Sequence, residues 1–270
     1  MNRKKMSKLE VLKNSDFILC FGQFLANTNE NIVDFINYAK NTNGAQVVYM
    51  HAVDSLALKD FYTQFIKYEA GSEEGVSALL LDTLVQNPSD KIKAYIDDLD
   101  IGYISAESSA GEEEFEEILE KSKNSKSKVL FVGDDIFSHG RVENIKKMLT
   151  AIDKYSDFEV VCESEFRLDN EELEEVEELL PYNGTVIYSY VDKQKDESIV
   201  YASASFIRIA KVNDKDKIKL ISSNDETVKT IKLDDTLQST IAICSTKEKG
   251  DDFLSCGYIY KPVKIERLED

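Results

Sequence analysis

The chain has 270 residues, of which 51 are Asp or Glu and 33 are Lys or Arg, so its formal net charge at pH 7 is −18. An acidic excess of this size repels nucleic acid and anionic membrane surfaces, and we expect neither as a partner. Apolar residues make up 42% of the chain and aromatic residues 10%, enough to build a sizeable core. This composition excludes a fully disordered chain, and the length fits one large domain or two small ones.

No apolar run is long enough to cross a bilayer. The longest one, residues 17–25, is interrupted by Gly22 and Gln23, whereas a spanning helix needs about 20 residues. The start of the chain is basic but lacks the apolar stretch of a signal peptide. We therefore expect a cytoplasmic protein without direct membrane insertion.

The four cysteines, Cys20, Cys162, Cys244 and Cys256, are scattered and include no CxxC pair. Zinc and iron–sulfur sites need thiolates that converge within a few ångströms. Cys20 and Cys162 lie in apolar, strand-like runs, where a small buried thiol is the usual explanation. The spacing therefore predicts no metal site.

Over the first 190 residues, short apolar runs alternate with segments of helical periodicity. The predicted strands are 16–21, 46–50, 129–132, 158–162 and 185–188. The predicted helices with clear bounds are 73–85, 111–123, 142–155 and 169–180. Two more helices are predicted from their caps: one begins at Asn29, and a short one begins at Ser89 and runs to about residue 99. This alternation predicts an α/β fold with a doubly wound, mainly parallel sheet.

The pattern changes after residue 190. Short strands are predicted at 206–210, 217–221, 227–233 and 239–244, joined by Asn- and Asp-containing turns. No helical period is visible there. The sequence therefore predicts two domains, an α/β domain over 1–190 and a small β-domain over 191–270.

The negative charge is concentrated in one part of the chain. Residues 95–180 contain 25 acidic and 9 basic residues, a net of −16, whereas residues 190–270 contain 15 acidic and 14 basic residues. The densest piece, 171–178, keeps its apolar positions at helical spacing. It is either a solvated acidic helix face or a docking face for a basic partner. If it is a docking face, replacing Glu171, Glu172, Glu174 and Glu175 by Gln should leave the fold intact and slow assembly.

No phosphate-binding loop is recognisable, because such a loop needs several glycines at the start of a helix. Gly22 is a lone glycine, and Gly133 is followed by Asp134 and Asp135, which would repel a phosphate. Gly111 precedes a run of three glutamates. The sequence is therefore not that of an ordinary dinucleotide-binding domain.

The chain contains two histidines, and each has two interpretations. His51 follows a buried strand at the expected carboxyl edge of the sheet, the usual place for ligand contacts in this fold class. His139 comes just ahead of a helix and suits a turn. Each has either a packing or turn role or a catalytic one. We identify no catalytic, cofactor-binding or metal-binding residue.

Several stretches of the sequence, taken together, resemble those of a known family. Residues 14–22, Asn29 and residues 44–48 form a strand ending in Gly, a helix opened by Asn, and a Gly-Ala-Gln-Val-Val strand. With residues 68–80 and the outline of the C-terminal β-region, they resemble the molybdopterin-oxidoreductase superfamily. Within it, residues 102–115 look most like the molybdoenzyme-like part of the large peripheral-arm subunit of proton-pumping NADH:quinone oxidoreductase (respiratory complex I).

The resemblance implies an inactive branch of that superfamily. The family's Asn-Pro is Asn29-Glu30 here, its Gly-Thr-Asp is 71–73 (Gly-Ser-Glu), and the Asp that faces its pterin falls near Met50 and His51. In complex I this portion is a scaffold without a pterin. The resemblance thus implies a non-catalytic structural or accessory subunit, or a fragment of one, with no redox cofactor of its own. Its partners would be other peripheral-arm subunits, and the parent complex would hold it at the inner membrane.

Two other interpretations stay open. One is a cofactor- or nucleotide-binding oxidoreductase that uses the carboxyl edge of the sheet near Gly22 and His51. The other is a free-standing protein-interaction module on a degenerate molybdoenzyme fold.

Overall fold

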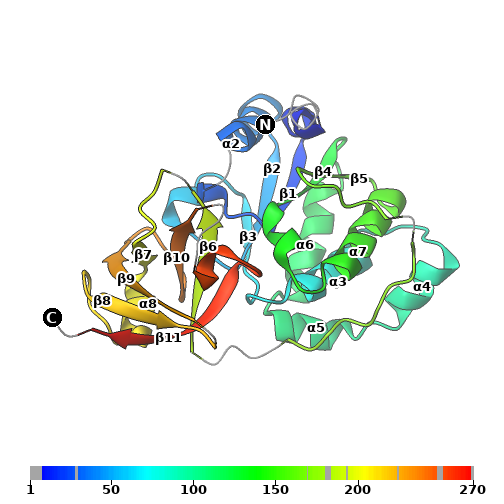
Figure 1. Ribbon diagram of the computed structural model, residues 1–270. Helices are drawn as coiled ribbons and strands as arrows, with labels where there is room; N and C mark the ends of the chain where they lie inside the picture. Colours follow the sequence, from blue (N-terminus) through cyan, green and yellow to red (C-terminus); the bar gives the residue numbers. More distant parts are fainter. Residues whose placement is uncertain are drawn as a thin grey trace. The chain divides into compact units, whose positions relative to one another are not determined.

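The computed structural model describes residues 8–27, 30–168, 170–179, 184–192, 194–223, 225–247 and 252–268. The chain forms two compact units, shown in Figure 1. Unit 1 comprises Met1–His51 and Leu58–Leu179, and unit 2 comprises Ala52–Ala57 and Leu180–Asp270. Unit 1 thus ends before residue 190, where the sequence predicted the boundary, because the strand expected at 185–188 belongs to unit 2.

Unit 1 is built on five strands: β1 (Phe17–Phe21), β2 (Gln46–Met50), β3 (Gln64–Ile66), β4 (Lys128–Val132) and β5 (Phe158–Cys162). They lie in the order β3-β2-β1-β4-β5, and all four pairings are parallel. Every residue of β1 is buried, as expected for the central strand of a parallel sheet covered on both faces. The predicted α/β class with a parallel sheet is confirmed.

The helices of unit 1 connect these strands: α2 (Glu30–Asn43), α3 (Glu73–Leu84), α4 (Asp90–Asp97), α5 (Ile101–Ser108), α6 (Glu112–Ser122) and α7 (Val142–Tyr155). Ser89 caps α4 as predicted, because its Oγ accepts a hydrogen bond from the N–H of Ile92 at 3.4 Å. Asp100 caps α5 in the same way, accepting from the N–H of Tyr103 at 3.0 Å, and this helix was not predicted. The predicted cap at Asn29 lies outside the described residues.

The connections run across the sheet in opposite directions. The β1-α2-β2 crossover leads to one edge and the β4-α7-β5 crossover to the other. Because parallel crossovers are right-handed, α2 covers one face and α7 the opposite face. Helix α3 packs against α7, α5 and α6, and Figure 1 shows α3 beside α7.

The predicted helix at 169–180 is wrong. Residues 170–179 form an extended, irregular segment, which we call the acidic strap. The strap lacks the hydrogen-bond ladder of a helix: Leu173 N donates to the carbonyl of Glu171 at 3.2 Å within the strap, and several other N–H groups donate to side chains of neighbouring helices. Three of these bonds run from Glu174 N to Asn144 Oδ1, from Glu177 N to Glu74 Oε2 and from Leu179 N to Glu107 Oε2.

Unit 2 is a closed barrel of six strands: β6 (Thr185–Val191), β7 (Ile199–Ala202), β8 (Lys217–Ile221), β9 (Glu226–Leu233), β10 (Ile241–Thr246) and β11 (Tyr260–Arg267). Their order around the barrel is β10-β6-β11-β8-β9-β7. The β6–β10 and β7–β9 pairings are parallel, and the other four are antiparallel. The predicted C-terminal β-domain is therefore present, and closure leaves it no free strand edge.

One strand predicted in this region is a helix. Residues 206–210 lie within α8 (Ala204–Ala210), whose cap is Ser203: its Oγ accepts from the N–H of Phe206 at 3.1 Å. Phe206 is fully buried in the barrel core. The apolar residues of this short run fit either period, and the Ser203 cap is the signal that distinguishes them. In the described part of the chain, no helix combines the length and the apolar character that crossing a membrane requires.

Candidate functional site

The strand order of unit 1 reverses direction between β1 and β4. In doubly wound sheets, ligands bind outside the carboxyl ends of the strands at this point. Three segments meet there: residues 22–24 after β1, His51 after β2, and residues 133–136 after β4. This edge is where the sequence placed the candidate residues Gly22 and His51.

The segments after β1 and β4 are in direct backbone contact. The N–H of Gly133 donates to the carbonyl of Phe21 at 2.8 Å. A Cβ on Gly133 would lie 2.2 Å from the carbonyl oxygen of Gly22, and a Cβ on Gly22 would lie 2.2 Å from Ile136 Cδ1. Gly22 also has a φ of +66°, in the left-handed region that favours glycine. Both glycines thus allow the two loops to approach each other closely.

The charge at this edge is also wrong for a phosphate. Asp134 and Asp135 form the first turn of a 3-10 helix, η4 (Asp134–Ser138). Asp134 Oδ1 accepts a hydrogen bond from Ser164 Oγ at 2.9 Å. The helix that follows β1, α2, begins with an acidic residue, Glu30. Carboxylates therefore occupy the helix starts where anion-binding sites present free N–H groups.

His51 lies fully buried at this edge, and its Nε2 is 3.2 Å from Asp135 Oδ2. Its ring stacks with those of Phe24 and Tyr49, at centroid distances of 5.5 and 5.8 Å, and meets Tyr68 edge-on at 6.2 Å. A carboxylate in this position can orient an imidazole for proton transfer. Here three aromatic rings pack against that imidazole, so the arrangement also holds the loops after β1, β2 and β3 together.

The sequence placed His51 at the carboxyl edge, and the structure confirms that position. It did not identify Asp135 as the partner, because the two residues are 84 positions apart in the chain. The packing of aromatic rings against His51 could not be predicted from the sequence either. A polar residue shortly after each of two parallel strands, β2 and β4, which lie on either side of β1, was the only signal available.

His139 has the hydrogen bonds of a turn residue. Its Nδ1 accepts from the backbone N–H of Arg141 at 3.0 Å, and its Nε2 lies 3.1 Å from the carbonyl of Gly71. Because Nδ1 accepts, the proton sits on Nε2, which donates to Gly71. His139 therefore ties the start of α7 to the loop before α3, in keeping with the turn interpretation.

The cysteines are in unreactive surroundings, with one exception. Cys20, Cys162 and Cys244 are buried, and Cys256 is exposed. Burial raises the pKa of Cys162 to about 12 and that of Cys244 to about 11, and it raises the pKa of Cys20 as well. Among the residues that the structure describes, no three His, Cys, Asp or Glu side chains are grouped as a metal ion would need.

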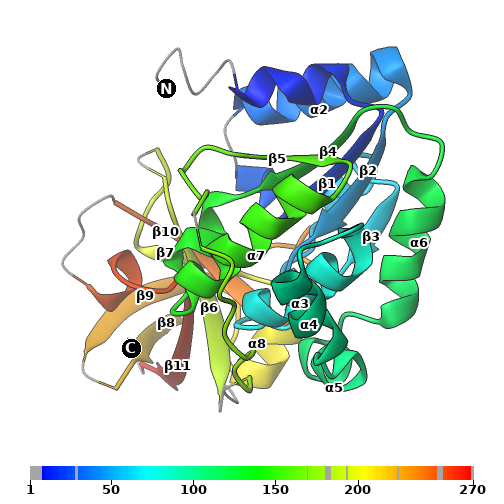
Figure 2. The same cartoon turned by 90° about the vertical axis from the view of Figure 1, so that its right-hand side faces the viewer.

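A second polar network lies where the acidic strap crosses unit 1. Figure 2 shows the strap as a yellow-green trace passing alongside α7. At one end, Glu171 accepts hydrogen bonds from Tyr155 Oη and Ser89 Oγ, both at 2.7 Å, and pairs with Lys154. These three partners hold the pKa of Glu171 down at about 2. Its carboxylate is therefore an internal contact of unit 1.

The centre of the strap is held through both its backbone and its side chain. Asn144 accepts from the N–H of Glu174 at 2.8 Å and donates to its carbonyl at 2.9 Å. Tyr95 Oη donates to the same carbonyl at 3.0 Å. The Glu174 carboxylate pairs with Lys147 at 3.0 Å and with Arg141 at 2.8 Å, and these pairs lower its pKa.

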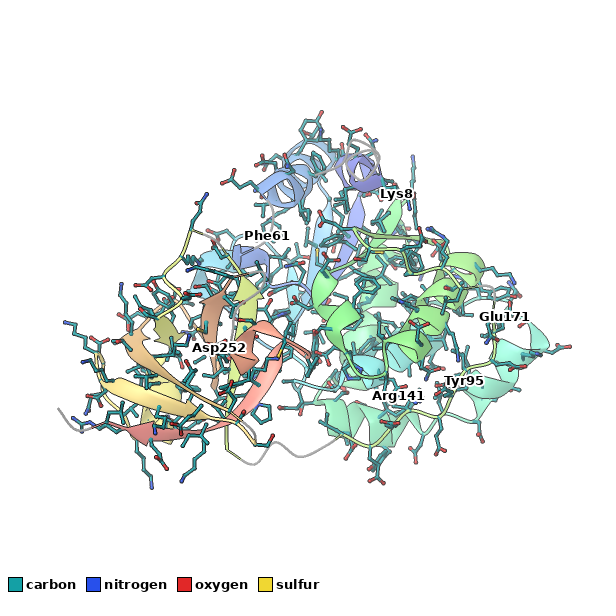
Figure 3. All side chains as sticks on the ribbon, in the orientation of Figure 1. Lys8, Phe61, Tyr95, Arg141, Glu171 and Asp252 are labelled. Atoms are coloured by element: carbon teal, nitrogen blue, oxygen red, sulfur yellow. The ribbon has the colours of Figure 1, made fainter. Side chains whose placement is uncertain are left out.

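The far end is anchored on a buried carboxylate. Glu74 is buried, and its Oε1 accepts from Asn144 Nδ2 at 2.7 Å and from Arg141 Nε at 3.1 Å. Its Oε2 accepts the backbone N–H of Glu177 at 3.1 Å. Arg141 also lies 3.3 Å from the Glu177 carboxylate. Figure 3 labels Glu171 and Arg141 at the two ends of this contact, with Tyr95 between them.

The acidic residues of the strap and the basic residues along α7 have matching spacings. Three of the strap's ion pairs are Glu171 with Lys154, Glu174 with Lys147 and Glu177 with Arg141. A polyproline II chain, which repeats every three residues, advances about 9 Å per repeat, and six or seven residues of helix span about 9–10 Å. Carboxylates at every third strap position therefore face cations spaced about two turns apart on the helix. An acidic residue at every third position, with Arg or Lys at 141, 147 and 154, was the sequence signal for this contact.

No protein-family model matches this chain, and no curated protein matches it either. The fold and the two networks define a class only: a parallel α/β unit in which the loops after β1 and β4 contact each other, followed by a six-stranded barrel. The resemblance to the molybdopterin-oxidoreductase superfamily stays a prediction.

Proposed function

We propose that the chain is a non-catalytic structural or accessory subunit of a larger assembly. Its first unit is a doubly wound α/β fold in which the usual ligand position holds the chain together. The observation that carries the proposal is the contact between Gly22 and Gly133, with Ile136 against Gly22 and carboxylates on the following turn. A phosphate-bearing cofactor would meet a closed backbone and like charge there.

The resemblance supplies the identity of the assembly. It implies a complex I-type NADH:quinone oxidoreductase, with the other peripheral-arm subunits as partners and a position at the inner membrane through the parent complex. The protein would contribute shape and contacts, and the redox cofactors would belong to its neighbours. A free-standing interaction module would share the same structure and differ only in its partners.

The His51–Asp135 pair is the observation that favours the alternative, a cofactor-binding oxidoreductase. A buried imidazole oriented by a carboxylate is a common proton-transfer unit. Its surroundings weigh against this role, because aromatic rings pack against the imidazole.

Purification from the native host tests the proposal. The chromosomal copy is tagged, the tagged protein is purified in mild detergent, and the eluate is assayed for reduction of a soluble quinone, for iron and for flavin. We expect the protein to elute in fixed ratio with quinone-reducing activity, and the protein expressed alone to contain neither iron nor flavin. Elution with other proteins but without quinone reduction would support the interaction module. Flavin or nicotinamide retained by the protein alone would support the oxidoreductase.

A further inference from the structure

The acidic strap is held by contacts of two kinds, and one kind does not depend on the identity of the strap's side chains. Asn144 bonds to both backbone groups of Glu174, and Tyr95 bonds to the carbonyl of the same residue. Arg141 Nη2 donates to the carbonyl of Glu175 at 3.1 Å. Every peptide in an extended conformation offers these backbone groups. Recognition of an extended segment commonly combines such main-chain bonds with side-chain selectivity.

The other kind selects carboxylates in one register. Arg141, Asn144, Lys147, Lys154 and Tyr155 form one surface along α7, which we call the α7 face. Its cations pair with strap positions 171, 174 and 177. The intervening acids at 172, 175 and 178 are exposed. Within the strap, the α7 face thus pairs with the register 171, 174 and 177, whereas Glu172 of the other register pairs with Lys91 of α4 at 3.6 Å.

The side chains that form the strap's ion pairs are only partly buried. Glu174 and Glu177 expose 52% and 65% of their side chains, and Lys154 exposes 57%. Ion pairs this exposed are weak and are screened by salt. The strap owes its position to its covalent tether as well, because a tethered segment has an effective concentration in the millimolar range.

We propose that the α7 face is a binding site for extended acidic segments with a carboxylate at every third residue, which the protein's own strap fills. A partner protein that carries such a segment binds there when it displaces the strap. Charge complementarity and the matched spacing identify the occupant, and this inference does not rest on the proposed function of the protein.

A competition experiment on the full chain tests this proposal. The opened variant carries Glu171→Gln, Glu174→Gln and Glu177→Gln, which weaken the strap and leave the α7 face intact. Its matched control carries Glu172→Gln, Glu175→Gln and Glu178→Gln, the same change in charge on the exposed positions. Circular dichroism and thermal unfolding establish that each variant folds. If the triple variant does not fold, Glu174→Gln alone removes the central pair and takes its place.

Two fluorescent peptides with the sequence of residues 170–179 serve as probes. The in-register peptide keeps Glu at positions 171, 174 and 177 and has Gln at 172, 175 and 178; the out-of-register peptide has the reverse arrangement. Fluorescence anisotropy at about 50 mM and 300 mM salt measures binding, because screening should weaken it at the higher salt. We expect the opened variant to bind the in-register peptide at least about tenfold more tightly than the out-of-register peptide.

The comparison between proteins completes the test. The wild type and the matched control should bind the in-register peptide at least about tenfold more weakly than the opened variant, because their own straps compete. Adding Lys147→Ala to the opened variant should remove the difference between the two peptides. Equal affinity for both peptides would overturn the proposal, since it would show only a general charge attraction. An opened variant that dimerises and thereby excludes the peptide would also overturn it, because the occupant would then be a second copy.

Discussion

At the scale of single residues, Gly22 and Gly133 determine how closely the loops after β1 and β4 approach each other at the carboxyl edge of the sheet. Gly133→Ala would place a methyl group 2.2 Å from the carbonyl oxygen of Gly22, and backbone cannot turn aside as a side chain can. We expect this substitution to lower the free energy of unfolding by about 2 kcal/mol or more. Urea unfolding measures it. Gly140→Ala is the control, because a Cβ at that position has no neighbour within 4 Å, and a destabilisation of similar size there would contradict the account.

The thiols offer a second test at this scale. Cys256 is exposed, whereas burial raises the pKa of the other three thiols. A thiol reagent should therefore modify one thiol per native chain and four in denaturant, since only an accessible thiolate reacts. Mass spectrometry should place the native label on Cys256, and Cys256→Ser should abolish it. Rapid native labelling of Cys162 would mean that the segment after β5 opens.

At the scale of the element, the strap should respond to acid. Because Lys154, Tyr155 and Ser89 hold the pKa of Glu171 at about 2, well below the ordinary value of about 4.3, its ionised form stabilises the fold. That stability is present above about pH 4.3 and is lost as the pH falls toward 2. We expect Glu171→Gln to cost about 1 kcal/mol at pH 7, since solvent screens a part-exposed pair. The cost should shrink between pH 5 and pH 3.

Urea unfolding of the wild type and the variant across that range measures this difference. Glu172→Gln is the control, because Glu172 exposes 76% of its side chain and its nearest cation, Lys91, is 3.6 Å away. Its effect should stay within about 0.5 kcal/mol at every pH. A cost for Glu171→Gln that does not change with pH would show that the carboxylate is not held by these partners.

The strap also shows where prediction from the sequence fails. The strands at 46–50 and 158–162 and the cap at Ser89 agree with the structure, because their signals are local. Apolar strap residues recur at helical spacing, yet a polyproline II-like chain also turns every third residue toward the same neighbour. Bonds from distant helices then decide the conformation. The His51–Asp135 pair was missed for the same reason, since its members are 84 residues apart.

At the scale of the whole molecule, the acidic excess has two parts with different roles. Glu171 and Glu174 pair with cations of the same chain, so replacing them disturbs the strap as well as any docking surface. We therefore expect the four-Gln variant to loosen the strap, whereas the sequence alone predicted that its fold would stay intact. A docking face for a basic partner would consist of the exposed acids at 172, 175 and 178.

The central claim is that the protein contributes contacts and no chemistry, and complementation in the native host tests it most directly. The gene is deleted and then restored as the wild type, as Asp135→Asn or as Gly133→Ala, and quinone reduction by membranes is measured beside the amount of assembled complex. Deletion should reduce activity and assembly together. Asp135→Asn removes the charge beside His51 and should restore both, whereas Gly133→Ala should restore less of either. Full assembly with lost activity in the Asp135→Asn strain would contradict the claim and make the His51–Asp135 pair catalytic.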